Sequence, residues 1–202
     1  MQGVDVIFGI IVLIMSVVVH EVSHGYIANN LGDPTARIAG RLTLNPIKHL
    51  DPVGSVLVPI FTYLIGGFIF GWAKPVPYNP YNLRGGKWGP ALVAAAGPLS
   101  NFLLAIIFGI VLRIVTPLSV IPEAALSLIE LIVLINIVLG IFNLIPIPPL
   151  DGSKVLFALL PPSMRNVENF FTRYQLILIV ALIFFAWRFI LPLVYFIFSL
   201  LT

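Results

Sequence analysis

Hydrophobic residues dominate this chain in long runs, which are separated by shorter stretches rich in polar residues, prolines and glycines. Four of the runs are long enough to form helices that cross a hydrocarbon layer of about 30 Å, at about 1.5 Å per residue. These predicted spans are residues 6–29, 91–112, 124–145 and 176–201. The pattern predicts an all-α polytopic membrane protein with four to five transmembrane helices.

A fifth hydrophobic run, residues 53–72, is long enough to span but contains Pro59 and a pair of adjacent glycines. The polar stretch after it, residues 73–90, has three basic residues and no acidic one. Because basic loops stay on the cytoplasmic side, a crossing by residues 53–72 would place this stretch on the wrong side. We therefore predict a re-entrant or membrane-associated hairpin, with a crossing helix as the alternative. Irregular backbone at this depth needs cover from protein or from a water-filled cavity.

A small β element is predicted after the first span. Residues 39–46 alternate hydrophobic and polar positions and end in turn-forming residues, a pattern typical of a short strand or hairpin. The surrounding loop is basic and contains Arg37, Arg41 and Lys48. This charge predicts that the C-terminal end of the first span faces the cytoplasm.

Composition agrees with a membrane protein and narrows the possible functions. Hydrophobic residues make up 59% of the 202 residues and charged residues only 9%, whereas soluble domains have about 25% charged residues. The net charge of +3 is spread over short loops, so we expect contact with the lipid bilayer and none with nucleic acid. Cysteine is absent, so any metal must be bound by histidine and carboxylate. We predict one membrane-embedded domain, residues 1–202, with a core at 6–160 and a C-terminal helix at 174–201.

The clearest functional signal is the sequence His20-Glu21-Val22-Ser23-His24 inside the first span. Two histidines four residues apart lie on one face of a helix, at the spacing that two imidazoles need to bind one zinc ion. The glutamate between them can act as a general base. Ionisable side chains at membrane depth are costly and usually functional, which favours a metal site over a chance motif in a structural scaffold. Such a site needs a third protein ligand.

The best candidate for that third ligand is Asp151. It follows residues 143–150, in which three prolines break the helix and expose backbone carbonyls. Such backbone is tolerated in a membrane only where it lines a cavity, so we expect Pro146 and Pro148 to contribute to a substrate-binding cavity. If residues 53–72 do not cross, the parity of the spans returns Asp151 to the side of the two histidines. The alternative is a structural role for Asp151, as a turn residue or as the cap of the helix that follows.

Three motifs, taken in order, resemble those of the site-2 proteases, a family of intramembrane zinc metalloproteases. They are H-E-x-x-H at residues 20–24, A-G-P-x-x-N at 96–101 and N-x-x-P-x-P-x-L-D-G at 143–152. The resemblance covers about residues 6–160 and is closest to a compact form without a PDZ-type or appended regulatory domain. In the middle motif, Asn101 is either a contact between helices or a functional residue, one that supports a metal ligand from behind or contacts the substrate.

The resemblance implies a role for each polar residue of these motifs. His20, His24 and Asp151 would bind one catalytic zinc ion. Glu21 would be the acid–base residue, and Asn143 would help to hold the substrate.

These expectations combine into an intramembrane zinc endopeptidase that cleaves membrane-spanning or membrane-adjacent proteins, such as single-span substrates, in regulated intramembrane proteolysis. We expect it in the cell membrane of a prokaryote, with its active site toward the cytoplasm. The alternative is a zinc-binding membrane protein without proteolytic activity, such as a metal transporter or an inactive chaperone-like relative. A transporter would place acidic residues or histidines on several spans, whereas this chain concentrates them at one site and keeps Glu21, which zinc binding does not require.

Overall fold

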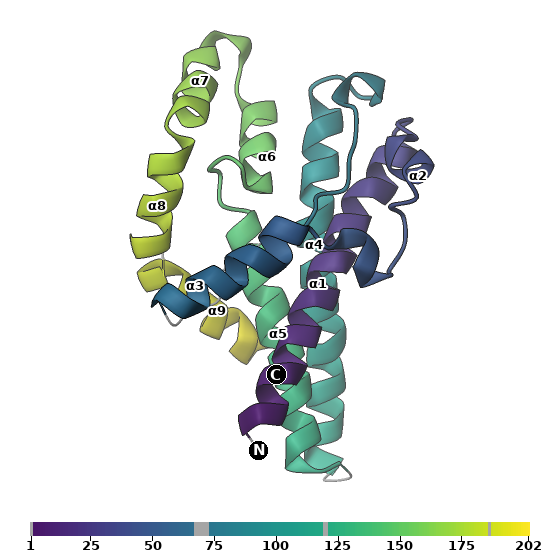
Figure 1. Cartoon of the computed structure of the whole chain (residues 1–202), viewed down its shortest axis with the longest axis vertical. Helices are drawn as coiled ribbons and strands as arrows, with labels where there is room; N and C mark the ends of the chain where they lie inside the picture. The colour runs from purple at the N-terminus through teal and green to yellow at the C-terminus, as the bar shows by residue number, and fades with distance from the viewer. Residues whose placement is uncertain (1, 67–72, 119–120, 186) are drawn as a thin grey trace.

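Three long helices packed side by side form the body of the protein (Figure 1). The computed structural model describes residues 2–66, 73–118, 121–185 and 187–202. The long helices are α1 (Gln2–Asn30), α4 (Trp88–Val115) and α5 (Glu123–Asn143), and α4 packs against both of the others. The shorter elements are α2 (Thr35–Ile38), η1 (Pro46–His49), η2 (Pro52–Leu57), α3 (Val58–Gly66), η3 (Pro80–Asn82), η4 (Thr116–Leu118), α6 (Asp151–Leu159), η5 (Pro162–Met164), α7 (Arg165–Arg173), α8 (Gln175–Phe185) and α9 (Trp187–Leu201).

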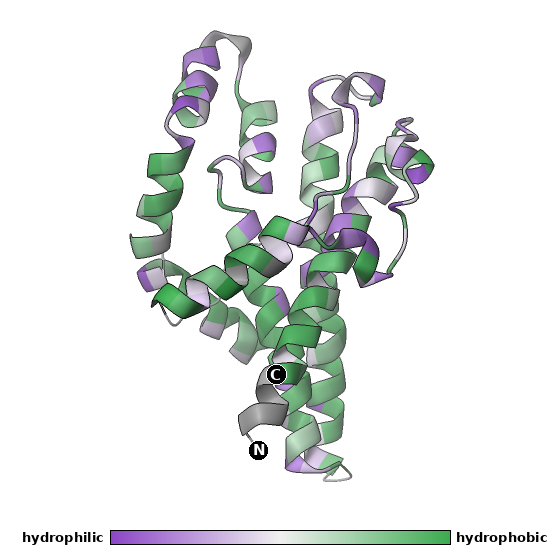
Figure 2. Cartoon of the chain, in the orientation of Figure 1, coloured by the Kyte–Doolittle hydropathy of each residue, from purple (hydrophilic) through white to green (hydrophobic). Residues whose placement is uncertain are grey.

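The same three helices are long and apolar enough to span a membrane, over Ile7–Asn30, Trp88–Leu118 and Glu123–Asn143. Figure 2 shows that hydrophobic residues cover most of their length. A fourth span is present only if α8 and α9 count together, and these two helices are bent by 60°. They have 11 and 15 residues and reach only about 16 and 23 Å. The described residues thus contain three clear spans, or four if the predicted span at 176–201 is a broken one, which is the lower end of the predicted four to five.

The apolar core lies where α4 and α5 meet α9. Its fully or almost fully buried side chains include Ala105, Val133 and Val194. On the outer surface, large apolar side chains such as Leu64 and Phe184 are 75% and 76% exposed. Exposed apolar surface of this extent is what a bilayer covers, so the protein is an integral membrane protein.

The predicted β element at residues 39–46 is wrong, because no strand occurs among the residues that the structure describes. Short polar side chains turn the backbone there instead. Thr43 Oγ1 accepts a hydrogen bond from Asn45 N at 3.2 Å, and Asn45 Oδ1 accepts one from Ile47 N at 3.1 Å, where η1 begins. Such local bonds compete with strand pairing, and a short hydrophobic alternation does not override them.

Up to residue 66, the hydrophobic run that begins at residue 53 forms η2 and α3. Asp51 caps the first of them, since its carboxylate accepts hydrogen bonds from Val53 N at 3.0 Å and Gly54 N at 2.6 Å. Helix α3 runs across the bundle instead of along α1 (Figure 1). The pair Pro52–Ile65 is shorter than the spanning helices. The rest of the predicted hairpin, residues 67–72, lies outside the described residues.

An irregular segment, residues 73–79, connects this region to η3; we call it the strap. Hydrogen bonds hold the strap in place at both ends. Near its start, Arg41 Nη2 donates to Lys74 O at 2.7 Å, and Lys74 N donates to His49 O at 2.9 Å. At its end, Asn79 N donates to Asp33 Oδ2 at 2.6 Å. The strap is thereby held against the residues that follow α1.

Asp33 is the fully buried anchor of this arrangement. It also accepts hydrogen bonds from Thr35 Oγ1 at 2.5 Å and Asn82 Nδ2 at 3.0 Å. Burial by itself raises the pKa of the carboxyl, but the hydrogen bonds from Thr35, Asn82 and Asn79 outweigh it and hold the pKa below the usual 3.8. The ionised carboxylate therefore stabilises the folded protein.

We expect Asp33→Ala to lower the free energy of unfolding by about 2–3 kcal/mol, because several buried donors lose a charged acceptor. Thermal unfolding in detergent measures this change. Since the folded pKa lies below the unfolded one, the stabilisation is present above about pH 4 and is lost as the pH falls through the folded pKa. The stability difference between the two proteins should narrow below pH 4, and a difference that stays constant or widens there would contradict this role.

Candidate metal centre

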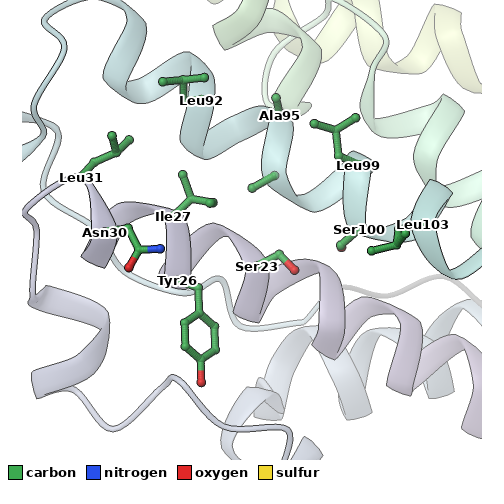
Figure 3. A pocket seen from close by; sticks show the side chains of 11 residues that line it. Ser23, Tyr26, Ile27, Asn30, Leu31, Leu92, Ala95, Leu99, Ser100 and Leu103 are labelled. Carbon is green, nitrogen blue, oxygen red and sulfur yellow. The ribbon is translucent and has the colours of Figure 1, made fainter.

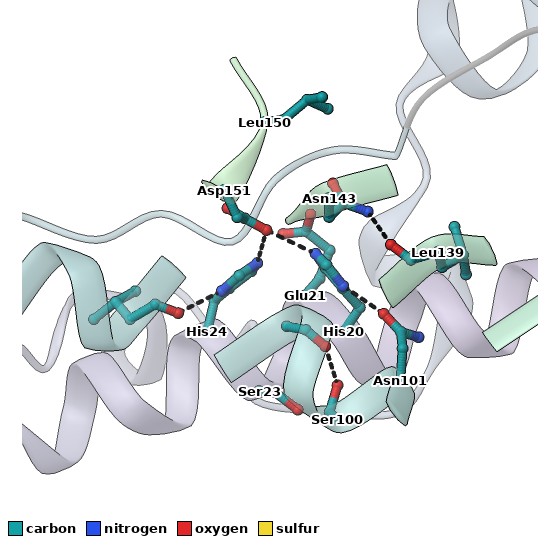
Figure 4. A network of polar contacts seen from close by, with 12 residues as sticks. His20, Glu21, Ser23, His24, Ser100, Asn101, Leu139, Asn143, Leu150 and Asp151 are labelled. Atoms are coloured by element: carbon teal, nitrogen blue, oxygen red, sulfur yellow. Dashed lines mark hydrogen bonds and ion pairs between the residues drawn. The ribbon is translucent and has the colours of Figure 1, made fainter. Parts of the chain in front are cut away.

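Three buried side chains from two distant parts of the chain converge on one point (Figure 4). His20 and His24 come from α1, and Asp151 is the first residue of α6. Asp151 Oδ2 lies 3.1 Å from Nε2 of His20 and 3.1 Å from Nε2 of His24. The exposed fractions are only 6% for His20 and 8% for each of the other two. The predicted zinc ligands are thus brought together in one buried cluster.

Glycine on α4 makes room for this cluster. A Cβ atom at Gly97 would lie 2.5 Å from Nε2 of both His20 and His24, so any side chain there would displace the imidazoles. Gly152 plays a similar part at the start of α6, because a Cβ there would collide with the backbone of Leu144. The side chains that pack against Gly97 are thus the two histidines.

Hydrogen bonds on the far side of each imidazole fix its protons. His24 Nδ1 lies 2.7 Å from Val93 O, and because a carbonyl only accepts, Nδ1 must carry the hydrogen. His20 Nδ1 lies 2.7 Å from Asn101 Oδ1, which is likewise an acceptor. In neutral imidazoles both Nε2 atoms are then left as lone pairs that face Asp151.

Two lone pairs that each lie 3.1 Å from the same carboxylate oxygen form with it a set of acceptors without a donor. Such a set fits a metal cation. Ligand atoms at about 2.0–2.1 Å from a tetrahedral zinc ion lie about 3.3 Å apart, which is close to the spacing here. Two histidines and one carboxylate also match the ligands of catalytic zinc sites that keep one position open.

Glu21 lies beside this cluster, and its carboxylate is within 4.8 Å of the ligand nitrogens of both histidines. One oxygen, Oε2, accepts a hydrogen bond from Val76 N of the strap at 2.8 Å. Asp151 contacts both imidazoles directly, whereas Glu21 is held by the strap. Of the two carboxylates, Asp151 is thus the one in direct contact with both imidazoles, and Glu21 lies next to it.

A cavity of about 180 Å³ opens onto the cluster. Asn143 lines it, while its Nδ2 donates to Leu139 O at 3.0 Å. Of the prolines at 146–149, Pro149 lines the cavity, whereas the predicted Pro146 and Pro148 do not. The full lining comprises His20, Glu21, His24, Pro75, Val76, Tyr78, Val93, Asn143, Pro149, Asp151 and Lys154.

Asn101 has a different place from the one predicted for a substrate contact. Its side chain is fully buried and bonded to His20, and it does not line the cavity. A substrate cannot reach a side chain with no exposed surface. Asn101 therefore contacts His20 from behind, the place expected of a residue that supports a metal ligand, and it also joins α4 to α1 and α5 through Ser16 and Asn136.

The strap and Lys154 are parts of the site that the sequence did not reveal. Lys154 Nζ lies 3.6 Å from Asp151 Oδ1 and 5.6 Å from the centroid of the Tyr78 ring. It follows Asp151 by three residues on α6, so helical spacing could have indicated it. No local pattern signals the strap, because its contacts with α1 and α6 join residues far apart in the sequence.

A larger cavity of about 570 Å³ lies between α1 and α4 (Figure 3). Its polar side chains include Ser23 and Ser100, which donate to carbonyls of their own helices, Val19 O and Gly97 O. The rest of its lining is largely apolar, and no histidine or carboxylate reaches it. The histidines of the cluster and the carboxylates of Glu21 and Asp151 line the smaller cavity instead.

Comparison with known proteins agrees with this geometry. Residues 114–185 match the model of peptidase family M50, a stretch that includes Asn143 and Asp151 but not the histidine motif. The chain is 42% identical to "Putative zinc metalloprotease YwhC" of Bacillus subtilis over 161 residues, which are 77% of this chain and 70% of that protein. It is 31% identical to "Zinc metalloprotease MJ0392" of Methanocaldococcus jannaschii over 159 residues, 79% of this chain and 36% of that protein.

A third relative, "Putative zinc metalloprotease Rip2" of Mycolicibacterium smegmatis, is 30% identical over 155 residues, and the match covers 57% of its length. No solved structure matches the chain. The resemblance carried by the three sequence motifs is thus confirmed by the family match and by the Bacillus relative. The chain belongs to peptidase family M50, the site-2 proteases, which are intramembrane zinc metalloproteases.

Proposed function

We propose that this protein is an intramembrane zinc endopeptidase with one catalytic ion bound by His20, His24 and Asp151. The observation that supports it best is the meeting of two imidazole lone pairs and a carboxylate oxygen at 3.1 Å, beside a glutamate that is not needed as a ligand. A zinc ion bound there would supply a Lewis acid and make water a nucleophile near neutral pH.

Glu21 is the proposed acid–base residue. The Val76 amide holds one of its oxygens at 2.8 Å and leaves the other able to take a proton from water in the cavity. The same oxygen can then deliver this proton to the nitrogen of the departing amine. The strap therefore orients the carboxylate for proton transfer.

The substrates we propose are membrane-spanning or membrane-adjacent proteins, such as single-span proteins, that unwind locally. A peptide bond within a helix has its carbonyl bonded and shielded, so it must leave the helix to be cut. Non-helical backbone of the strap and of residues 144–150 borders the cavity and offers space for an extended peptide. We propose that Asn143, which lines this space, hydrogen-bonds the substrate backbone.

The proposed location is the cell membrane of a prokaryote, with the site toward the cytoplasm. His20 and His24 lie in the C-terminal half of α1, and the residues that follow α1 include Arg37, Arg41 and Lys48. A transporter is less well supported, because only one cluster of potential metal ligands was found within the described part of the chain, and it includes Glu21.

Glu21→Gln should keep zinc but lower the rate of peptide cleavage by at least about 10²-fold, because an amide cannot shuttle the proton. Cleavage of a single-span substrate in liposomes, together with metal analysis of the same sample, measures both quantities. The matched control is Glu130→Gln, which changes an exposed glutamate on α5 and should leave both unchanged. Full activity in Glu21→Gln would rule out the proposed role.

Asp151→Ala should purify with little zinc, because only two neutral ligands remain. Metal analysis after dialysis against a weak chelator measures this loss. Asp51→Ala removes a carboxylate that caps η2 and does not line the cavity, so it should retain zinc. Equal zinc content in Asp151→Ala and in the unchanged protein would remove Asp151 from the ligand set.

Gly97→Ala should weaken zinc binding without changing any ligand, since its methyl group would occupy the space of both imidazoles. Gly9→Ala on α1 is the control, because a Cβ atom there would lie 3.6 Å from Leu131, an ordinary contact. Titration of the metal-free proteins with zinc compares the two affinities. The packing argument fails if both variants bind zinc as tightly as the unchanged protein.

A further inference from the structure

A chain of buried polar groups extends from His20 away from the cavity, into the contact between α1, α4 and α5. Its members are Ser16, Asn101 and Asn136, with exposed fractions of 4%, 0% and 1%. All three lie within segments that can span the membrane. Polar groups buried at this depth are costly unless every donor and acceptor is paired. In this chain the hydrogen bonds also fix which atom of each asparagine amide donates and which accepts.

A backbone carbonyl fixes the orientation of the first amide, that of Asn136. Asn136 Nδ2 lies 2.9 Å from Ile132 O and 2.9 Å from Ser16 Oγ. Because a carbonyl oxygen only accepts, the amide nitrogen of Asn136 must face Ile132. The oxygen of the same amide, Oδ1, must then face Asn101.

The same logic fixes the next amide. Asn101 Nδ2 lies 2.9 Å from Asn136 Oδ1 and 3.3 Å from Ser16 O, and both of these atoms are acceptors. The nitrogen of Asn101 therefore points to α5 and α1, and its Oδ1 points to His20 Nδ1 at 2.7 Å. This oxygen accepts the Nδ1 hydrogen, which leaves His20 Nε2 free to bind a metal.

His24 needs no such chain, because its Nδ1 bonds directly to the carbonyl of Val93, which cannot reverse. An asparagine amide can turn over and exchange its oxygen for its nitrogen. A reversed Asn101 would present N–H groups to His20 Nδ1 and favour the tautomer with the hydrogen on Nε2. That tautomer has no lone pair to offer to the metal.

We propose that Asn136, together with Ser16, is a positioning residue that fixes the amide orientation of Asn101 and thereby the metal-binding tautomer of His20. This proposal rests on the proposed zinc site, but it concerns metal affinity and not the reaction. Groups behind a ligating histidine commonly change metal affinity by about 10- to 100-fold. We expect the lower end for Asn136, because it acts through Asn101.

The test compares zinc affinity in the full-length protein in detergent, by competition with a chelator. Asn136→Leu removes the nearer of the two acceptors that orient Asn101 and leaves only Ser16 O at 3.3 Å, so the zinc dissociation constant should rise about 10-fold. Asn136→Asp keeps an oxygen toward Asn101 and should stay closer to the unchanged protein. Ile141→Ala is the control for lost stability, because it truncates a buried apolar side chain on the same helix and removes no polar atom.

Cobalt substitution adds a readout that general destabilisation does not alter. The visible absorption of bound Co²⁺ depends on ligand identity and geometry, so it should change in Asn136→Leu and stay unchanged in Ile141→Ala. If Asn136→Leu does not fold, Ser16→Ala is the milder variant, with an expected few-fold loss of affinity.

The outcomes separate this proposal from the proposed function. Equal affinities and spectra in the folded Asn136 or Ser16 variant and in Ile141→Ala would overturn the positioning role. Absence of zinc binding in the unchanged protein would also overturn it. If the unchanged protein binds zinc but cleaves no peptide, the endopeptidase proposal fails while the affinity series still decides the role of Asn136.

Discussion

The structure depends on one unfavourable arrangement, the approach of three acceptors in a nearly dry interior. His20 Nε2, His24 Nε2 and Asp151 Oδ2 are 3.1 Å apart in both imidazole–carboxylate pairs, and no donor lies between them in neutral imidazoles. In an apolar surrounding such a set is stable only around a cation. The positions of α1, α4 and α6 follow from this need, since Gly97 lets α4 approach the imidazoles and Gly152 lets α6 bring in the carboxylate.

The sequence predicts those parts of the site that depend on the spacing of residues along one helix, or on the presence of ionisable residues inside a membrane span. Two histidines four apart share a helix face wherever the helix lies, and ionisable residues in an apolar run stand out. Asp151 could also be predicted, because the number of spans before it places it on the same side of the membrane as the histidines. The three spans counted on the way to Asp151 correspond to α1, α4 and α5, which are the clear spans of the described residues, and the bent pair of α8 and α9 comes only after Asp151.

Other features could not be predicted, because they depend on contacts between residues distant in sequence. The hydrogen bond from Val76 N to Glu21 joins residues that are 55 positions apart, and no periodic pattern in the sequence predicts it. The prediction of a β element was wrong for the opposite reason. There the conformation is set locally, because the side chains of Thr43 and Asn45 accept hydrogen bonds from backbone N–H groups two residues further on. Asn101 lies between these cases. A polar residue in a hydrophobic run signals importance, but only packing shows that it bonds to His20 and not to a substrate.

A membrane protease has to admit water to its metal while keeping lipid away, and two cavities on different sides of the α1–α4 contact separate these tasks. The larger one is lined mostly by apolar side chains, and its serines bond to their own helices, so it offers little to water. The smaller one is bordered by the strap and the proline-rich segment, where the backbone is not helical. Helices conceal their own backbone polar groups, so irregular segments are the natural place for water to enter a bilayer protein. The proline-rich segment thus places Asp151 against the two histidines and borders the same cavity with backbone that is not helical.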